Sequence, residues 1–405
     1  MALRRALAAL LVLAATAATT RAQQSSPGSQ GSAPPVSLYG VVPQDSGAPR
    51  GSGQTEPVTP TAVDPDAAST KRGEPVIAPL PLVNPTIGSG LIVIAGYLYR
   101  LNPDDHTTPP SGTFVGGFGT DNHSWGVMAG QEFHFGRDRV RVEAAGAYAS
   151  VHYDFFGIGQ AAGQANTSVP LVQEGGAGLA NALIRVGGRW FAGAQYTLMQ
   201  MKVRVDTDAL ATELPASLDR DVDLRTASLG PRIELDTRDN PFYARSGVYF
   251  NAMAAFYGQD VGGQRGYQSY QVWGSQYLSL GERQVLAWRA SACAVASDVP
   301  FYDLCELGKS QDLRGYVVGQ YRDRGLVAAQ AEYRAEIWRF IGGTAFVGAG
   351  ETVPAFDKLT WNQVLPGAGV GLRVTVANRN HVNIRADYAW GKNSHAFYVG
   401  VGEAF

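Results

Sequence analysis

The chain has little charge and almost no cysteine. Charged residues make up 17% of its 405 residues, against about 25% in an average soluble protein. Its two cysteines are too few for a disulfide-dense scaffold or for a multi-cysteine zinc or iron–sulfur site. A formal net charge of -2 does not suit a basic nucleic-acid-binding protein. We therefore expect no nucleic-acid partner.

Long apolar runs are also missing, apart from a short one near the amino terminus. Arg4 and Arg5 precede an apolar stretch at 6–18, and small residues follow at 20–22. This stretch is too short to span roughly 30 Å of hydrocarbon. Residues 1–22 are therefore predicted to be a secretory signal peptide and not a membrane anchor. No apolar run of about 18 residues occurs later, so the sequence predicts no transmembrane helix.

Residues 23–73 consist almost entirely of Gln, Ser, Gly, Pro, Ala, Thr and Asp. Such a segment cannot bury enough apolar surface to offset the entropy lost on ordering. We therefore predict a disordered Pro/Ser/Gly-rich linker at 23–73, followed by a single folded domain at 74–405.

The domain at 74–405 is rich in segments in which apolar and polar residues alternate. At 327–338 the even positions include Gln330, Glu332 and Arg334, while the odd positions are apolar. Segments at 382–390 and 370–376 behave in the same way. Successive side chains of a strand point to opposite faces, so each segment has one apolar and one polar face. The fold class is therefore predicted to be all-β.

A soluble antiparallel sheet would show the same alternation, but three further features favour a transmembrane barrel. Several segments reach the nine to eleven or so residues that a tilted strand needs to cross a bilayer. Aromatic residues lie near the ends of the apolar faces, as at a membrane interface. The predicted signal peptide indicates that the chain is exported. Fifteen candidate strands can be counted, and a weak one at 75–82 makes sixteen, because bacterial barrels usually have even numbers.

This strand count also predicts a topology. Gly262, Gln311 and Asn362 would lie in external connections, while Asp105 and the turn at 240–246 would be periplasmic. Cysteines introduced in the external set should be labelled on intact cells.

The connection between the strands at 285–296 and 327–338 contains the sequence Leu-Arg-Gly-Tyr at 313–316. Together with Asp-Thr-Arg-Asp-Asn-Pro at 236–241, it resembles the BamA/TamA superfamily of outer-membrane barrels, the bacterial surface antigen family. The resemblance implies a loop that folds back into the lumen and a role in insertion or translocation of proteins at the bacterial outer membrane. The implied partners are outer-membrane lipid, client proteins and, during biogenesis, the barrel assembly machinery. Family insertases carry folded POTRA modules ahead of the barrel, and the predicted linker at 23–73 leads us to expect none in this sequence.

Arg314, Gly315 and Tyr316 form the predicted tip of this loop. Gly315 permits a tight turn, and a guanidinium inside a barrel needs a carboxylate partner because it stays charged. Glu332 is the first candidate partner and Asp387 the second. Where the family tends to place an aspartate, this chain has Gly348, which predicts fewer anionic partners for the arginine. An ordinary solvated arginine in a turn remains the alternative.

The last predicted strand covers 397–405. Phe397, Val399 and Val401 would share its lipid face, and Phe405 would end the strand. The resemblance makes Phe405 the assembly signal.

Cys293 and Cys305 are twelve positions apart, and an oxidising envelope would allow a disulfide between them; two separate thiols are the alternative. The histidines show no metal-ligand spacing, and no catalytic motif stands out. We therefore predict no cofactor, no metal site and no enzymatic activity. A passive diffusion pore or structural barrel is the alternative to a role in protein insertion.

Overall fold

The computed structural model describes residues 74–102, 108–206, 223–240, 243–377 and 382–405. The predicted signal peptide and linker, as well as Asp105, lie outside the described residues.

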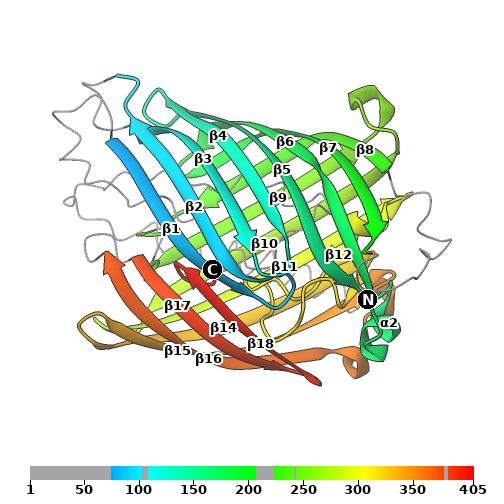
Figure 1. The fold of residues 1–405 in the computed structure, drawn as a ribbon. Coiled ribbons are helices and arrows are strands. Elements are labelled where there is room, and N and C mark those ends of the chain that lie inside the picture. The colour runs from blue at the N-terminus through cyan, green and yellow to red at the C-terminus, as the bar shows by residue number, and fades with distance from the viewer. Residues whose placement is uncertain (1–73, 103–107, 207–222, 241–242, 378–381) are drawn as a thin grey trace.

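The described residues form a closed antiparallel barrel of sixteen strands (Figure 1). The all-β prediction and the strand count are therefore confirmed. The weak segment at 75–82 is β1, which pairs with β2 along its whole length. The barrel strands are β1 (Glu74–Asn84), β2 (Gly88–Tyr99), β3 (Ser111–Thr120), β4 (Trp125–Phe135), β5 (Val140–Phe155), β6 (Val169–Gly187), β7 (Trp190–Val205), β8 (Asp223–Asp236), β9 (Gly247–Tyr257), β10 (Tyr267–Ser279), β11 (Gln284–Ser297), β14 (Gly325–Trp338), β15 (Ile341–Val353), β16 (Leu365–Ala377), β17 (Val382–Gly391) and β18 (Ser394–Val401).

The smaller elements lie in the connections between the barrel strands. They are the helix α2 (Gln160–Ala165), the two-stranded sheet of β12 (Cys305–Glu306) and β13 (Arg322–Asp323), and the 3-10 turns Gln259–Val261, Phe301–Asp303, Phe356–Lys358 and Trp361–Gln363. Among the described residues, no helix is long and apolar enough to cross a membrane.

The two faces of the barrel wall differ as the alternation predicts. On β14, Gln330, Glu332 and Arg334 point inward and are almost completely buried, while Ile337 is 66% exposed on the outside. The same holds on β15, where Val347 is 62% exposed. Exposed apolar side chains around the outside are what a lipid-facing surface requires.

Antiparallel alternation sorts the connections onto two rims. The connections after β5, β9, β11 and β15 lie at one end, which we call the loop rim, and those after β4, β8 and β10 lie at the other, the turn rim. Gly262 and Asn362 are exposed on the loop rim. Gln311 belongs to a loop-rim connection but is only 7% exposed, so the expectation that it is accessible to labelling is wrong.

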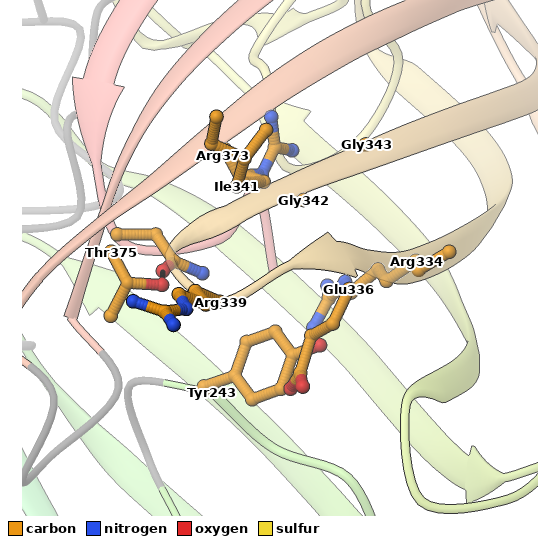
Figure 2. A pocket seen from close by; sticks show the side chains of 11 residues that line it. Tyr243, Arg334, Glu336, Arg339, Ile341, Gly342, Gly343, Arg373 and Thr375 are labelled. Atoms are coloured by element: carbon orange, nitrogen blue, oxygen red, sulfur yellow. Dashed lines mark hydrogen bonds between the residues drawn. The ribbon is translucent and has the colours of Figure 1, made fainter.

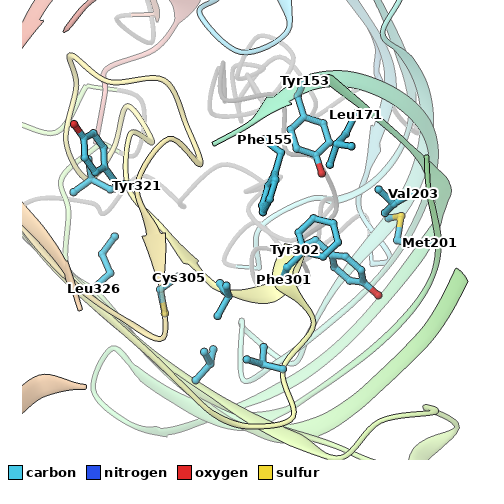
Figure 3. Close-up of a cluster of buried hydrophobic side chains, with 14 of the residues drawn as sticks. Tyr153, Phe155, Leu171, Met201, Val203, Phe301, Tyr302, Cys305, Tyr321 and Leu326 are labelled. Carbon is cyan, nitrogen blue, oxygen red and sulfur yellow. The ribbon is translucent and has the colours of Figure 1, made fainter. Parts of the chain in front are cut away.

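Gln311 is buried because residues 298–324, the connection between β11 and β14, fold into the lumen. Phe301 and Tyr302 of this inner loop pack with Phe155 of β5 and Met201 of β7 (Figure 3). This cluster takes in side chains from opposite walls of the barrel. The loop-rim half of the lumen is therefore filled by a hydrophobic core and not by a water-filled channel.

The connection between β5 and β6 covers the inner loop from outside. The backbone N–H of Gly159, just before α2, donates to the carbonyl of Arg322 at 2.8 Å, and Gln320 Nε2 donates to the carbonyl of Gly163. A Cβ on Gly163 would lie 2.5 Å from the carbonyl oxygen of Gln320. Glycine therefore permits the close packing of α2 on the inner loop.

The end of the chain differs from the prediction. β18 ends at Val401 and not at Phe405, and residues 402–405, which we call the tail, leave the sheet. Phe405 is 4% exposed and packs inside the barrel with Tyr277 and Ala287. Phe397 faces outward as expected, but Val401 is buried. Inside the barrel the tail meets charged and aromatic partners.

Candidate functional site in the barrel lumen

The tip of the inner loop is fixed by its backbone against the barrel wall. Gly315 has a φ of 110°, and a Cβ there would lie 2.8 Å from the carbonyl carbon of Trp390. Its N–H donates to the hydroxyl of Tyr398 at 3.1 Å. Tyr316 donates to the carbonyl of Pro366 at 2.5 Å. A glycine is needed here both for the positive φ and for the close approach to β17.

The Arg314 side chain is fully buried and is held by two carboxylates. Its Nη1 lies 2.6 Å from Asp387 Oδ2, and its Nη2 pairs with Glu332 Oε2. Nε donates to Gln330 Oε1 at 3.2 Å, and the guanidinium carbon lies 3.4 Å from the centre of the Phe346 ring. The structure thus brings Arg314 together with its two candidate partners from the sequence, Glu332 and Asp387, and we call this interaction the lock. Arg314 is not a solvated turn arginine.

These pairs belong to a larger ionic cluster. Arg334 Nε lies 2.7 Å from Glu332, Arg373 Nη1 lies 2.5 Å from Asp387, and Arg373 Nε lies 2.7 Å from Glu403 of the tail. We call the six residues Arg314, Arg334, Arg373, Glu332, Asp387 and Glu403 the lumen ion network. These six residues carry three positive and three negative charges, and charges buried away from water need such pairing. The buried Arg385 adds a further positive charge that acts on Asp387.

With glycine at position 348, Arg314 still has both carboxylate partners that the sequence offered, Glu332 and Asp387. Asp387, reaching in from β17, supplies the second carboxylate. A Cβ on Gly348 would lie 2.6 Å from the carbonyl oxygen of Ala329 and 2.9 Å from Leu313 Cδ1. An aspartate at this position has no room, so it would push the inner loop away and would not strengthen the lock.

A pocket at the turn rim lies next to this network. Arg334, Arg373 and Tyr243 line it together with Glu336 (Figure 2). Burial raises the pKa of the Tyr243 hydroxyl, which lies in the turn after β8, to about 12. Tyr243 is therefore neutral at physiological pH, and the ionised groups lining the pocket are predominantly arginines.

A disulfide joins Cys293 of β11 to Cys305 at the entry of the inner loop, with Cα atoms 5.8 Å apart. It attaches the descending part of the loop to the wall. Only the residues beyond Cys305 can therefore move far from the lumen without breaking a covalent bond.

A second charged cluster lines the opposite wall. Arg141 of β5 lies 2.7 Å from Asp138 and 3.1 Å from Glu234 of β8, and His134 contacts Asp138 at 2.9 Å. The turn-rim half of the lumen is thus charged on both sides, in contrast to the hydrophobic loop-rim half.

Several members of the lumen ion network were not predicted as site residues. Arg334 and Arg373 lie on polar strand faces and could have been found by asking which lumen-facing positions are charged. Glu403 carried no such signal, because it lies outside any strand and reaches Arg373 only through the path of the tail.

Fold and site together define an outer-membrane-type β-barrel whose own loop is locked in the lumen. A family model described as the Omp85 superfamily domain matches residues 117–405. The chain belongs to the Omp85 superfamily, as the resemblance of its loop motif predicted. A search of curated protein sequences finds no match.

Solved structures share this architecture at low sequence identity. BamA from Haemophilus ducreyi lacking POTRA domains 1–3 is 14% identical, with a TM-score of 0.52 over 82% of this chain and 70% of that chain. CdiB from Escherichia coli is 10% identical, with a TM-score of 0.58 over 82% of this chain and 62% of that chain. CdiB from Acinetobacter baumannii is 11% identical, with a TM-score of 0.53 and coverages of 82% and 60%. The chain thus spans less than two thirds of either CdiB, and at these identities the likeness shows the fold alone.

Proposed function

We propose that the protein resides in the bacterial outer membrane and assists the insertion of other proteins into it. The proposal rests on the contrast between the tightly packed lumen and the weak pairing of the first and last strands. The lumen is filled by a hydrophobic core and an ion network, whereas β1 and β18 are joined through a single residue pair, Val83 and Val399. A client protein crossing the lumen would have to disrupt the hydrophobic core. A client protein leaving through the barrel wall would have to separate only the junction of β1 and β18, which we call the seam.

Membership of the Omp85 superfamily and the similarity to BamA support this proposal. So do the locked inner loop and the weak seam, which suit a barrel that opens toward the membrane. Translocation through the lumen is the other role that the family resemblance implies. It would require the inner loop to leave the lumen, and the Cys293–Cys305 disulfide keeps the part of the loop up to Cys305 attached to the wall.

The test is a folding assay in liposomes. A urea-unfolded small outer-membrane barrel should fold faster into vesicles that contain this protein than into empty vesicles. Oxidising the variant Val83→Cys/Val399→Cys should close the seam and abolish the acceleration, while the reduced double variant and the single variant Val83→Cys serve as controls. Equal folding rates with and without the protein would refute the proposal.

The alternative is a passive diffusion pore. The polar turn-rim half of the lumen favours it, since charged walls are typical of pores. The hydrophobic loop-rim half argues against it. Planar-bilayer recordings decide between the two: a steady, large conductance of the intact protein would support the pore, and a closed baseline would support the insertion role.

A further inference from the structure

The first strand carries its prolines in one register. Between Glu74 and Pro85 the prolines occupy positions 75, 79, 81 and 85, all of them odd. A proline has no backbone N–H and is tolerated in a sheet only where that N–H would not be needed by a neighbouring strand.

A hydrogen bond between β2 and β3 shows which neighbouring strand the backbone groups at the odd positions of β1 face. The carbonyl of Ser89 accepts from Asp121 N at 2.8 Å, so the odd residues of β2 face β3 and its even residues face β1. Leu82 pairs with Gly90 and Leu80 with Ile92. The even residues of β1 therefore bond to β2. The backbone N–H and C=O positions of its odd residues, which include Pro75, Pro79 and Pro81, therefore point toward β18.

On the other side of the seam, the odd residues of β18 point toward β1. Gly402 N donates to the carbonyl of Asn383 on β17 at 2.7 Å, which assigns the even positions to β17. The odd positions of β18 are His395, Phe397, Val399 and Val401, each of which has an N–H. Every odd position of β18 can therefore donate a backbone hydrogen bond toward β1, whereas β1 can donate toward β18 only from Ile77 and Val83. The observed pair is at Val83.

The tail would be the natural partner of the remaining part of β1. Continuing the register of Val83 and Val399 by two residues places Pro81 opposite Val401, and by two more Pro79 opposite Glu403. Both positions on β1 lack a donor. In the lumen, Glu403 instead accepts from Arg373 and from Asn383 Nδ2 at 2.7 Å each.

Further contacts hold the end of the tail. Arg334 Nη2 donates to the main-chain oxygen of Phe405 at 2.7 Å, and the Phe405 ring packs on Tyr277.

We propose that the prolines of β1 keep the turn-rim half of the seam unzipped and thereby direct residues 402–405 into the lumen. The seam is then asymmetric. Every odd position of β18 presents a backbone N–H toward β1, whereas β1 presents one toward β18 only at Ile77 and Val83. This inference concerns the barrel itself and does not depend on the proposed function.

Amide hydrogen exchange tests the proposal directly, because the variant Pro79→Val/Pro81→Val creates two reporter N–H groups. If the prolines hold the seam open, these new amides become protected by pairing with Val401 and Glu403, and the Glu403 amide gains protection with them. Two restored ladder bonds are expected to slow exchange by about tenfold or more. In the unmodified protein, the Ile77 amide should exchange at least about tenfold faster than that of Val83.

The matched control is Pro231→Val in β8, which removes a proline from the opposite wall and should leave the exchange of Ile77 and Glu403 unchanged. Pro81→Val alone provides a milder variant should the double variant fold poorly, as judged by heat-modifiable mobility. The proposal is overturned if the new amides exchange as fast as Ile77 does in the unmodified protein. It is also overturned if Ile77 is already as protected as Val83.

Discussion

Removing the Arg314 side chain should release the inner loop from the lumen. Arg314 is fully buried and bonded to Glu332, Asp387 and Gln330. Breaking a buried ion pair by removing one partner costs about 3–5 kcal/mol, because the other charge is left uncompensated. Here each carboxylate keeps a second arginine, Arg334 or Arg373. We therefore expect the lower end of that range, about 3 kcal/mol for Arg314→Ala.

A change of about 3 kcal/mol shifts the equilibrium between docked and released loop by roughly two orders of magnitude, at about 1.4 kcal/mol per decade. Trypsin can report this shift by cleavage after Lys309. The Cys293–Cys305 disulfide does not bridge that site, so cleavage separates two fragments on a denaturing gel. The variant should be cut far faster than the unmodified protein.

Glu332→Ala should cost more than Arg314→Ala, because Glu332 lies within ion-pair distance of three arginines, Arg314, Arg334 and Arg373, whereas Arg314 pairs with two carboxylates. The double variant should be less affected than the sum of the two single variants, since the two residues share one interaction. Arg324→Ala is the matched control, an exposed arginine of the same loop whose Nη1 donates to the carbonyl of Ser297. Unchanged cleavage in both single variants would show that the loop is not held by this pair.

Three further outcomes are expected. Replacing both Cys293 and Cys305 by serine should lower the thermal midpoint, because a loop of this size contributes about 3 kcal/mol in the chain-entropy model; an unchanged midpoint in a heat-modifiability series would contradict this. Deleting Phe405 should reduce the amount of heat-modifiable folded barrel in the membrane, since its ring fills a buried cluster, and full yield would argue against a role in assembly. A cysteine at Gly262 should react with an impermeant thiol reagent on intact cells and one at Glu282 should not, because the two connections lie on opposite rims; labelling of Glu282 alone would invert the topology.

The sequence alone determined the barrel. Alternation with a period of two is a local property, so the lumen-facing positions of β14, such as Glu332 and Arg334, could be identified without knowledge of their neighbours. The loop tip at Arg314 to Tyr316 could also be identified, through its resemblance to the loop motif of the family. An arginine and a glycine at that tip then require a charge partner and a tight turn. The number of strands followed from counting such segments.

Only the tertiary structure decided what those residues meet. The tail at 402–405 carries a terminal phenylalanine that reads as the continuation of a strand, yet it enters the lumen, where Glu403 meets Arg373 from a different strand. Asp387 was the second candidate partner of Arg314 in the sequence, but only the structure shows that β17 brings it to the same guanidinium as Glu332. These outcomes depend on distances between segments far apart in the chain, and alternation carries no information about such distances. The prolines of β1 are visible in the sequence, but their effect follows only once the structure shows which neighbour the odd positions face.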